Sequence, residues 1–202
     1  QNLRSNGAKA ILDGSFDEVR AYLEENTADR KATVLDKLNF QSETNISSDV
    51  SFSYLFITEA KTGATPVALT KGFYSFGNAD FSPDGKKIIF SADIDSAEHP
   101  DRSLESQIYT INTDGSQLKM LLGEKGKRYF APKLSPTGKW MAFAYSTTSF
   151  VNVPKLAIIP VDGAEKDIIT ISFDRATQNL TWTNDEKYLY FTAASNGGSP
   201  IY

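Results

Sequence analysis

The sequence contains no cysteine and a single histidine, His99. The lack of cysteine excludes disulfide bonds, thiolate catalysis and zinc sites built on thiolates, although a periplasmic protein can lack cysteine as easily as a cytosolic one. A Ser-His-Asp triad needs a histidine base, and the segment around His99 has no Gly-x-Ser-x-Gly nucleophile motif. A surface-loop histidine is the simpler interpretation, and we expect no catalytic residue in this chain.

The 202 residues also lack a long apolar run and an excess of positive charge. No stretch approaches the roughly 18 apolar residues of a membrane-spanning helix, and no basic segment precedes a short apolar one as in a signal peptide. The net charge of −4 argues against a nucleic-acid-binding surface, which would be basic. We therefore expect neither membrane insertion nor nucleic-acid binding.

What the sequence does contain is a repeated pattern: a large apolar residue, a four-residue turn, a lysine and a strand. The pattern occurs at 81–86, 134–139 and 182–187, with apolar strands at 88–90, 141–143 and 189–191. Counted from Ser82 through Ser135 to Thr183, the turns are 53 and 48 residues apart. A self-similar all-β unit of this period is typical of a propeller blade.

Each repeat predicts a blade of four antiparallel strands. Pro83 and Gly85 suit the turn between the first two strands, and the Asp-Gly pairs at 114–115 and 162–163 suit the hairpin between the last two. Pleat alternation places Phe90, Phe143 and Phe191 on one face, where we expect core packing. The predicted strands are 52–58 and 66–69; 75–81, 87–92, 107–113 and 118–122; 130–134, 140–145, 156–161 and 166–171; and 179–182 and 188–193.

Residues 1–31 stand outside the repeat. The run Ser15-Phe16-Asp17-Glu18 has the pattern of a capping box, and apolar residues at 16, 19, 22 and 23 share one helical face. We expect a loop and one short helix over 16–25, as an insertion, and then about four blades over 32–202 with incomplete outer ones. Because a propeller ring usually closes with four to eight whole blades, the sequence reads as a piece of a longer polypeptide.

Two connections are long, 93–106 and 146–154, and both join the second strand of a blade to the third. Connections at one topological position emerge on one face of the ring, which is often the binding face; the alternative is that surface loops tolerate insertions. The charged groups there could hold peptide termini, and an aromatic ring could add an apolar contact. The candidate substrate-binding residues are Glu98, His99, Asp101, Arg102 and Phe150.

No metal or cofactor site is expected. Carboxylates at 93, 95, 98 and 101 crowd the first long loop, but the order of ligands and glycine in an EF-hand is missing. The glycines form no phosphate-binding motif. A solvated polar loop is the interpretation that the pattern favours.

The segment Ser82-Pro83-Asp84-Gly85-Lys86-Lys87-Ile88-Ile89-Phe90 resembles the propeller repeat of two groups. One is the periplasmic Tol-system propeller. The other is the non-catalytic propeller of prolyl oligopeptidase-family serine peptidases, which include dipeptidyl- and acylaminoacyl-peptidases. The stretches at 34–40 with 54–57, 76–81, and 98–102 with 108–109 are similar to the peptidases.

The resemblance covers roughly residues 32–202 and implies a bacterial peptidase with an αβ-hydrolase domain after the propeller. The catalytic serine, aspartate and histidine would lie in that domain, which this chain lacks. The implied function is a substrate-gating propeller for a peptidase of short peptides, periplasmic or secreted, with a cytoplasmic location as the other option. The alternative is a protein-binding propeller of the Tol type with no enzyme attached, and a Gly-x-Ser-x-Gly motif beyond Tyr202 would decide between them.

Overall fold

A computed structural model describes residues 15–17, 20–21, 41, 52–94, 104–149 and 151–202 of the chain, which divides into two units, 1–49 and 50–202. The predicted helix over 16–25 is not seen as a continuous element. Residues 16, 17, 20 and 21 are helical, and the rest of that stretch lies outside the described residues. Phe16 is 77% exposed, so its ring gains little from burial, and an isolated short helix is marginal in water. No described helix is long and apolar enough to cross a membrane.

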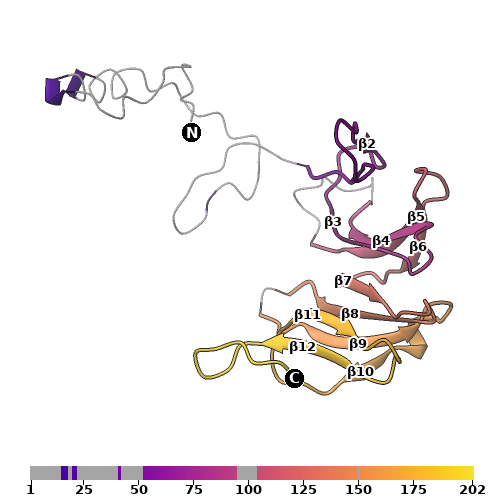
Figure 1. Ribbon diagram of the computed structural model, residues 1–202. Coiled ribbons are helices and arrows are strands. Elements are labelled where there is room, and N and C mark those ends of the chain that lie inside the picture. Colours follow the sequence, from indigo (N-terminus) through magenta and orange to yellow (C-terminus); the bar gives the residue numbers. More distant parts are fainter. Residues whose placement is uncertain (1–14, 18–19, 22–40, 42–51, 95–103, 150) are drawn as a thin grey trace. The chain divides into compact units, whose positions relative to one another are not determined.

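The second unit is built from strands arranged in four antiparallel sheets (Figure 1). Sheet 1 contains β1-β2, sheet 2 contains β3-β4-β5-β6, sheet 3 contains β7-β8-β9-β10, and sheet 4 contains β11-β12. Strands that follow one another in the chain are neighbours in every sheet, which confirms the predicted four-stranded antiparallel blades. The described elements are β1 (Phe56–Ile57), β2 (Val67–Ala68), β3 (Phe76–Phe81), β4 (Lys87–Ala92), β5 (Gln107–Asn112), β6 (Lys119–Leu122), β7 (Lys127–Leu134), β8 (Trp140–Thr147), β9 (Lys155–Pro160), the 3-10 helix η1 (Glu165–Asp167), β10 (Ile169–Ile171), β11 (Thr177–Trp182) and β12 (Leu189–Ala193).

The outer strand of sheet 3 departs from its predicted bounds of 166–171. β10 begins only at Ile169, because η1 occupies the preceding residues. The Asp167 carboxylate accepts a hydrogen bond from the Ala164 backbone N–H at 2.9 Å. Such local bonds compete with strand pairing. The strands of sheet 1 are likewise shorter than the predicted 52–58 and 66–69.

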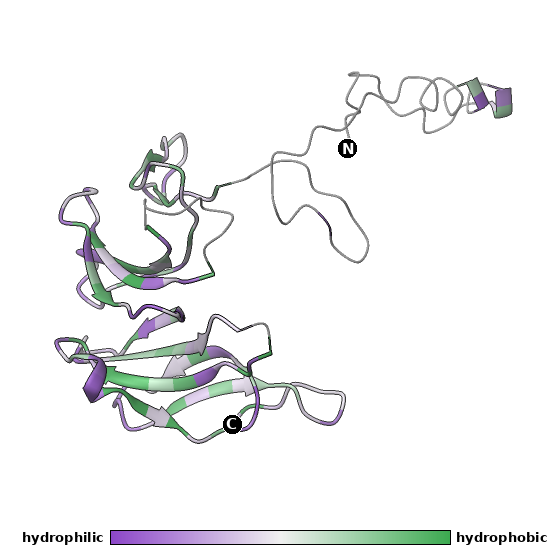
Figure 2. Cartoon of the chain, turned by 180° about the vertical axis from the view of Figure 1, so that it is seen from behind, coloured by the Kyte–Doolittle hydropathy of each residue, from purple (hydrophilic) through white to green (hydrophobic). Residues whose placement is uncertain are grey.

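Hydrophobic residues follow the strands (Figure 2) and form clusters between successive sheets. Phe90 lies in the cluster between sheets 1 and 2, Phe143 in that between sheets 2 and 3, and Phe191 in that between sheets 3 and 4. These rings are 0%, 0% and 7% exposed. Each therefore extends from the second strand of its sheet toward the preceding sheet, which confirms that the three phenylalanines are equivalent core residues.

The first strand of sheets 2, 3 and 4 also carries a bulge at the same place. The pairing register shifts within β3, β7 and β11. Inside each shift one residue is left-handed: Asn78 with φ 51°, Ala131 with φ 51° and Asn179 with φ 54°. These residues are again 53 and 48 apart, as the turns are. The blade repeat thus includes a bulge that the sequence pattern did not reveal.

Candidate functional site

The three repeated turns lie at one end of the strands and use their polar side chains internally. At the first, the Asp84 carboxylate accepts a hydrogen bond from the Ser82 hydroxyl at 2.6 Å, and this bond holds the pKa of Asp84 below its usual value. Thr183 and Asp185 repeat the arrangement at 2.6 Å. Each turn is closed by one backbone hydrogen bond, from the N–H of its fourth residue to the carbonyl of its first. The bonds run from Gly85 to Ser82 at 2.8 Å, from Gly138 to Ser135 at 2.8 Å and from Glu186 to Thr183 at 2.9 Å. The predicted equivalence of the turns is confirmed.

The turns of sheets 3 and 4 are also joined to each other. The Glu186 carboxylate of sheet 4 accepts hydrogen bonds from the backbone N–H and the hydroxyl of Thr137 in sheet 3, at 2.5 and 2.9 Å. The backbone bond, followed by the hydroxyl bond, holds the pKa of Glu186 below its usual value. The carboxylates of Asp84, Asp185 and Glu186 are therefore already bonded within or between the turns.

The two long connections, β4–β5 and β8–β9, emerge at the opposite end of the strands, and Gly126 joins them. Its backbone N–H donates to the Glu105 carboxylate at 2.7 Å, and its carbonyl accepts from the Thr148 backbone N–H at 3.0 Å. Gly126 lies in the β6–β7 connection with φ 79°, a conformation that other residues adopt only at a cost. The described ends of both loops lie at this end of the strands, as predicted, and we call this end the loop rim.

Further bonds anchor the end of the first long loop on the next sheet. The Ser106 hydroxyl donates to the Tyr129 carbonyl at 2.7 Å, and the Tyr129 N–H donates to the Ser106 carbonyl at 2.9 Å. Ser106 also pairs with Arg128 in a parallel bridge. The loop of sheet 2 is thus held at the first strand of sheet 3.

Arg128 is an exposed cation at this anchor. Its guanidinium carbon lies 5.8 Å from the centre of the Phe130 ring, a cation–π distance. It forms no ion pair with any described residue. A guanidinium fixed in this way can bind a carboxylate with two parallel hydrogen bonds.

Several other charged groups interact with one another near the β6–β7 connection. Lys127 donates to Glu124, which holds the pKa of Glu124 below its usual value and raises the pKa of Lys127. Burial, and then the nearby Glu124, raise the pKa of Glu165. Burial likewise raises the pKa of the Tyr129 hydroxyl. The Lys127–Glu124 pair stabilises the β6–β7 connection, and its charges are engaged within the protein.

The substrate-binding residues predicted from the sequence all lie outside the described residues. This applies to Glu98, His99, Asp101, Arg102 and Phe150. What the sequence reasoning missed is the anchor itself, Glu105, Ser106, Gly126, Arg128 and Thr148. The one local signal was Glu-Lys-Gly-Lys at 124–127, a turn sequence between two strands. Within the described ranges, no three histidine, aspartate or glutamate side chains come together as a metal site would require.

Antiparallel sheets stacked face to face, with the first strand and hairpin turn of sheets 2, 3 and 4 in the same place, are typical of a β-propeller. A family model, the dipeptidyl peptidase IV (DPP IV) N-terminal region, matches residues 20–152, and the chain belongs to that family. This confirms the predicted resemblance to the propeller domain of prolyl oligopeptidase-family peptidases.

The chain is also similar to several curated proteins. It is 26% identical over 166 residues to dipeptidyl-peptidase 5 of Arthroderma otae, an alignment covering 74% of this chain and 23% of the relative. The same values hold for dipeptidyl-peptidase 5 of Trichophyton schoenleinii. The chain therefore spans about a quarter of the length of the curated relatives it matches.

Solved structures share the fold. TolB from Acinetobacter baumannii superposes with a TM-score of 0.57 and 21% identity, over 74% of this chain and 34% of that one. Puromycin hydrolase superposes with a TM-score of 0.53 and 18% identity, over 73% of this chain and 26% of that one. At this identity the likeness shows the propeller fold alone.

Proposed function

We propose that this chain is the substrate-gating propeller of a serine peptidase that acts on short peptides. In this proposal the loop rim faces a hydrolase domain of the same polypeptide, and the two long loops limit what reaches its active site. Arg128 binds the carboxylate of a peptide substrate. The chain itself supplies no nucleophile.

The observation that carries the proposal is the connection of both long loops through Gly126. Loops that only tolerated insertions would need no shared anchor, whereas a gate needs loops held at a fixed position. Membership of the dipeptidyl peptidase IV N-terminal region family supports a peptidase as the parent protein. The relatives named dipeptidyl-peptidase 5 support the same class.

Shortening each loop in the full-length enzyme tests the proposal. Residues 95–103 are replaced by a short Gly-Ser link, and separately residues 149–153 by Asn-Gly, so that Glu105, Ser106 and Thr148 keep their bonds. We expect kcat/KM for a short peptide to fall about tenfold or more in either variant, because substrate positioning is lost. Lengthening the β5–β6 turn at Asp114-Gly115, on the opposite rim, is the matched control and should have no effect.

The alternative is a protein-binding propeller of the Tol type with no enzyme attached. It predicts no Gly-x-Ser-x-Gly motif in the gene beyond Tyr202. If the motif is present but both shortened variants keep the wild-type kcat/KM with unchanged thermal stability, the loops have no gating role.

A further inference from the structure

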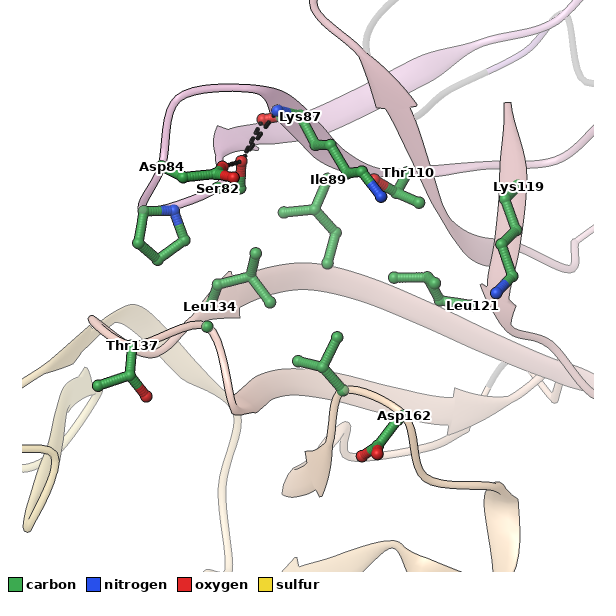
Figure 3. Close-up of a pocket in the computed structure, with 13 residues that line it drawn as sticks. Ser82, Asp84, Lys87, Ile89, Thr110, Lys119, Leu121, Leu134, Thr137 and Asp162 are labelled. Atoms are coloured by element: carbon green, nitrogen blue, oxygen red, sulfur yellow. Dashed lines mark hydrogen bonds between the residues drawn. The ribbon is translucent and has the colours of Figure 1, made fainter. Parts of the chain in front are cut away.

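A cavity of about 510 Å³ lies between sheets 2 and 3, at the turn end of the strands and away from the loop rim (Figure 3). Its size is typical of small-molecule sites. The lining is apolar at its centre, with side chains from both sheets: Ile89, Leu121, Leu134 and Val161. An apolar chain bound there would be removed from water on two sides.

The wall from sheet 2 adds a polar row. Cross-strand pairing places Ile89 opposite Thr110, and Thr110 opposite Lys119. Lys87 precedes Ile89 by two residues and therefore lies on the same face. Figure 3 shows the Lys87 side chain extending toward Thr110. Thr110 is 9% exposed, so a nearly buried hydroxyl lies between the two lysines.

Both ammonium groups lack partners in the described part of the chain. No ion pair joins Lys87 or Lys119 to a described residue. The acidic residue that lines this wall, Asp84, is already bonded to the Ser82 hydroxyl and to the Lys86 backbone N–H. The wall from sheet 2 is thus positive next to an apolar floor.

The facing wall has the opposite charge. Asp162, in the turn after β9, lines the cavity from sheet 3 and is exposed. A bound anion would be repelled from that side and attracted to the lysines. The division of charge therefore orients a ligand, with its anionic group on sheet 2 and its apolar part on the floor.

We propose that this cavity binds a small amphipathic carboxylate, a monocarboxylic acid with a medium-length apolar chain. The carboxylate is bound by Lys87 and Lys119, with Thr110 as a further hydrogen-bond donor, and the chain lies on Leu121, Leu134 and Val161. The inference does not depend on the proposed peptidase role, because the site lies at the end of the strands opposite the loop rim.

The test is a titration of the protein with octanoate. Binding is measured by calorimetry and by the methyl NMR signals of Leu121, Leu134 and Val161. Octanamide, with the same chain and no charge, and acetate, with the charge and no chain, are the control ligands. The variants are Lys87→Gln and Lys119→Gln. Lys86→Gln is the matched control, because Lys86 is adjacent in sequence but does not line the cavity.

We expect saturable binding of octanoate that shifts these methyl signals, with octanamide and acetate much weaker. Each of Lys87→Gln and Lys119→Gln should weaken binding about fivefold, and Lys86→Gln should not. Circular dichroism melts confirm that the variants are folded, as expected for exposed lysines. The proposal is wrong if the methyl signals do not move, if octanamide binds as tightly as octanoate, or if Lys86→Gln weakens binding as much as the other two.

Discussion

At the scale of single residues, Glu186 shows how a repeat can lose a preferred residue and gain a contact. The two earlier turns have glycine at this position, with φ 67° at Gly85 and 72° at Gly138, whereas Glu186 adopts φ 58°. A left-handed non-glycine residue costs roughly 1–2 kcal/mol. The Glu186 carboxylate accepts two hydrogen bonds from Thr137 on the neighbouring sheet. These bonds offset part of the cost and join sheets 3 and 4.

The Glu186 contact should depend on pH. The pKa of Glu186 is below its ordinary value of 4.5 in the fold, so the unfolded chain takes up the proton first as the pH falls. The stabilisation is therefore complete above that ordinary value and is lost as the pH falls through the lowered one. We expect the wild type to be more stable than Glu186→Gln at pH 7, and the difference to shrink in acid.

Urea unfolding of both proteins at stepwise lower pH measures this difference. Glutamine has the same side-chain length as glutamate. Both proteins therefore have a non-glycine residue in the left-handed conformation at 186, and its backbone strain cancels from the comparison. A difference that stays constant down to strong acid would contradict the account.

At the scale of elements, the left-handed residue of the bulge forms a side-chain hydrogen bond with the neighbouring strand in sheets 2 and 4. The Ser91 hydroxyl lies 3.2 Å from the Asn78 side-chain oxygen, and the Asn179 amide donates to the Thr192 hydroxyl at 3.0 Å. In sheet 3 the bulge residue is Ala131, which has no such group. Asparagine tolerates the left-handed region better than alanine, so sheet 3 has the least favourable bulge of the three.

Introducing an asparagine at the bulge of sheet 3, together with a hydroxyl residue on the strand beside it, should therefore give a coupling free energy between the two substitutions. The equivalent changes are Ala131→Asn and Ala144→Ser. Ala144 is 3% exposed, so serine alone places a buried hydroxyl whose backbone acceptor, as for Ser91 and Gly77 at 3.2 Å, is a long one. With both changes present, we expect a favourable coupling free energy of about 1 kcal/mol, one intramolecular hydrogen bond. A double-mutant cycle from urea unfolding measures it, and strictly additive effects would show that the bond does not form.

These elements also show what the sequence can and cannot predict. Turns with proline, aspartate and glycine are local, so their residues predict both the hairpins and the blade period. Ala131 has no turn chemistry, and the one signal beside it is Pro132, which within a strand indicates a bulge or an edge. The anchor of the loop rim joins Glu105, Gly126 and Thr148, which are distant in sequence and meet only when two sheets pack. The predicted site residues lay in the loops themselves, whose positions no local pattern determines.

At the scale of the whole molecule, the two ends of the strands differ in kind. One end carries short turns, two of which bond to each other, and the other carries the ends of the two long loops with a shared anchor at Gly126. Such a division suits a domain that uses one face for a partner and the other for its own stability. The catalytic groups would then belong to another part of the polypeptide.

The purified chain alone should not hydrolyse peptides. Acyl transfer by serine needs a base that activates the hydroxyl, and His99 is the only histidine in the sequence. Chromogenic dipeptide and acyl-amino-acid substrates provide the assay, and the full-length enzyme is the positive control. Turnover by the chain that disappears in a His99→Ala variant would overturn this prediction.

The gating role is tested most directly by substrate size selectivity in the full-length enzyme. The quantity is the ratio of kcat/KM for a short peptide to that for a long polypeptide with the same terminal sequence. Glu105→Ala combined with Ser106→Ala removes the side-chain bonds that anchor the first loop, and Thr113→Ala, which loses a bond at the opposite rim, is the control. We predict that the ratio falls in the double variant and not in the control. An unchanged ratio in a double variant of wild-type thermal stability would contradict the account.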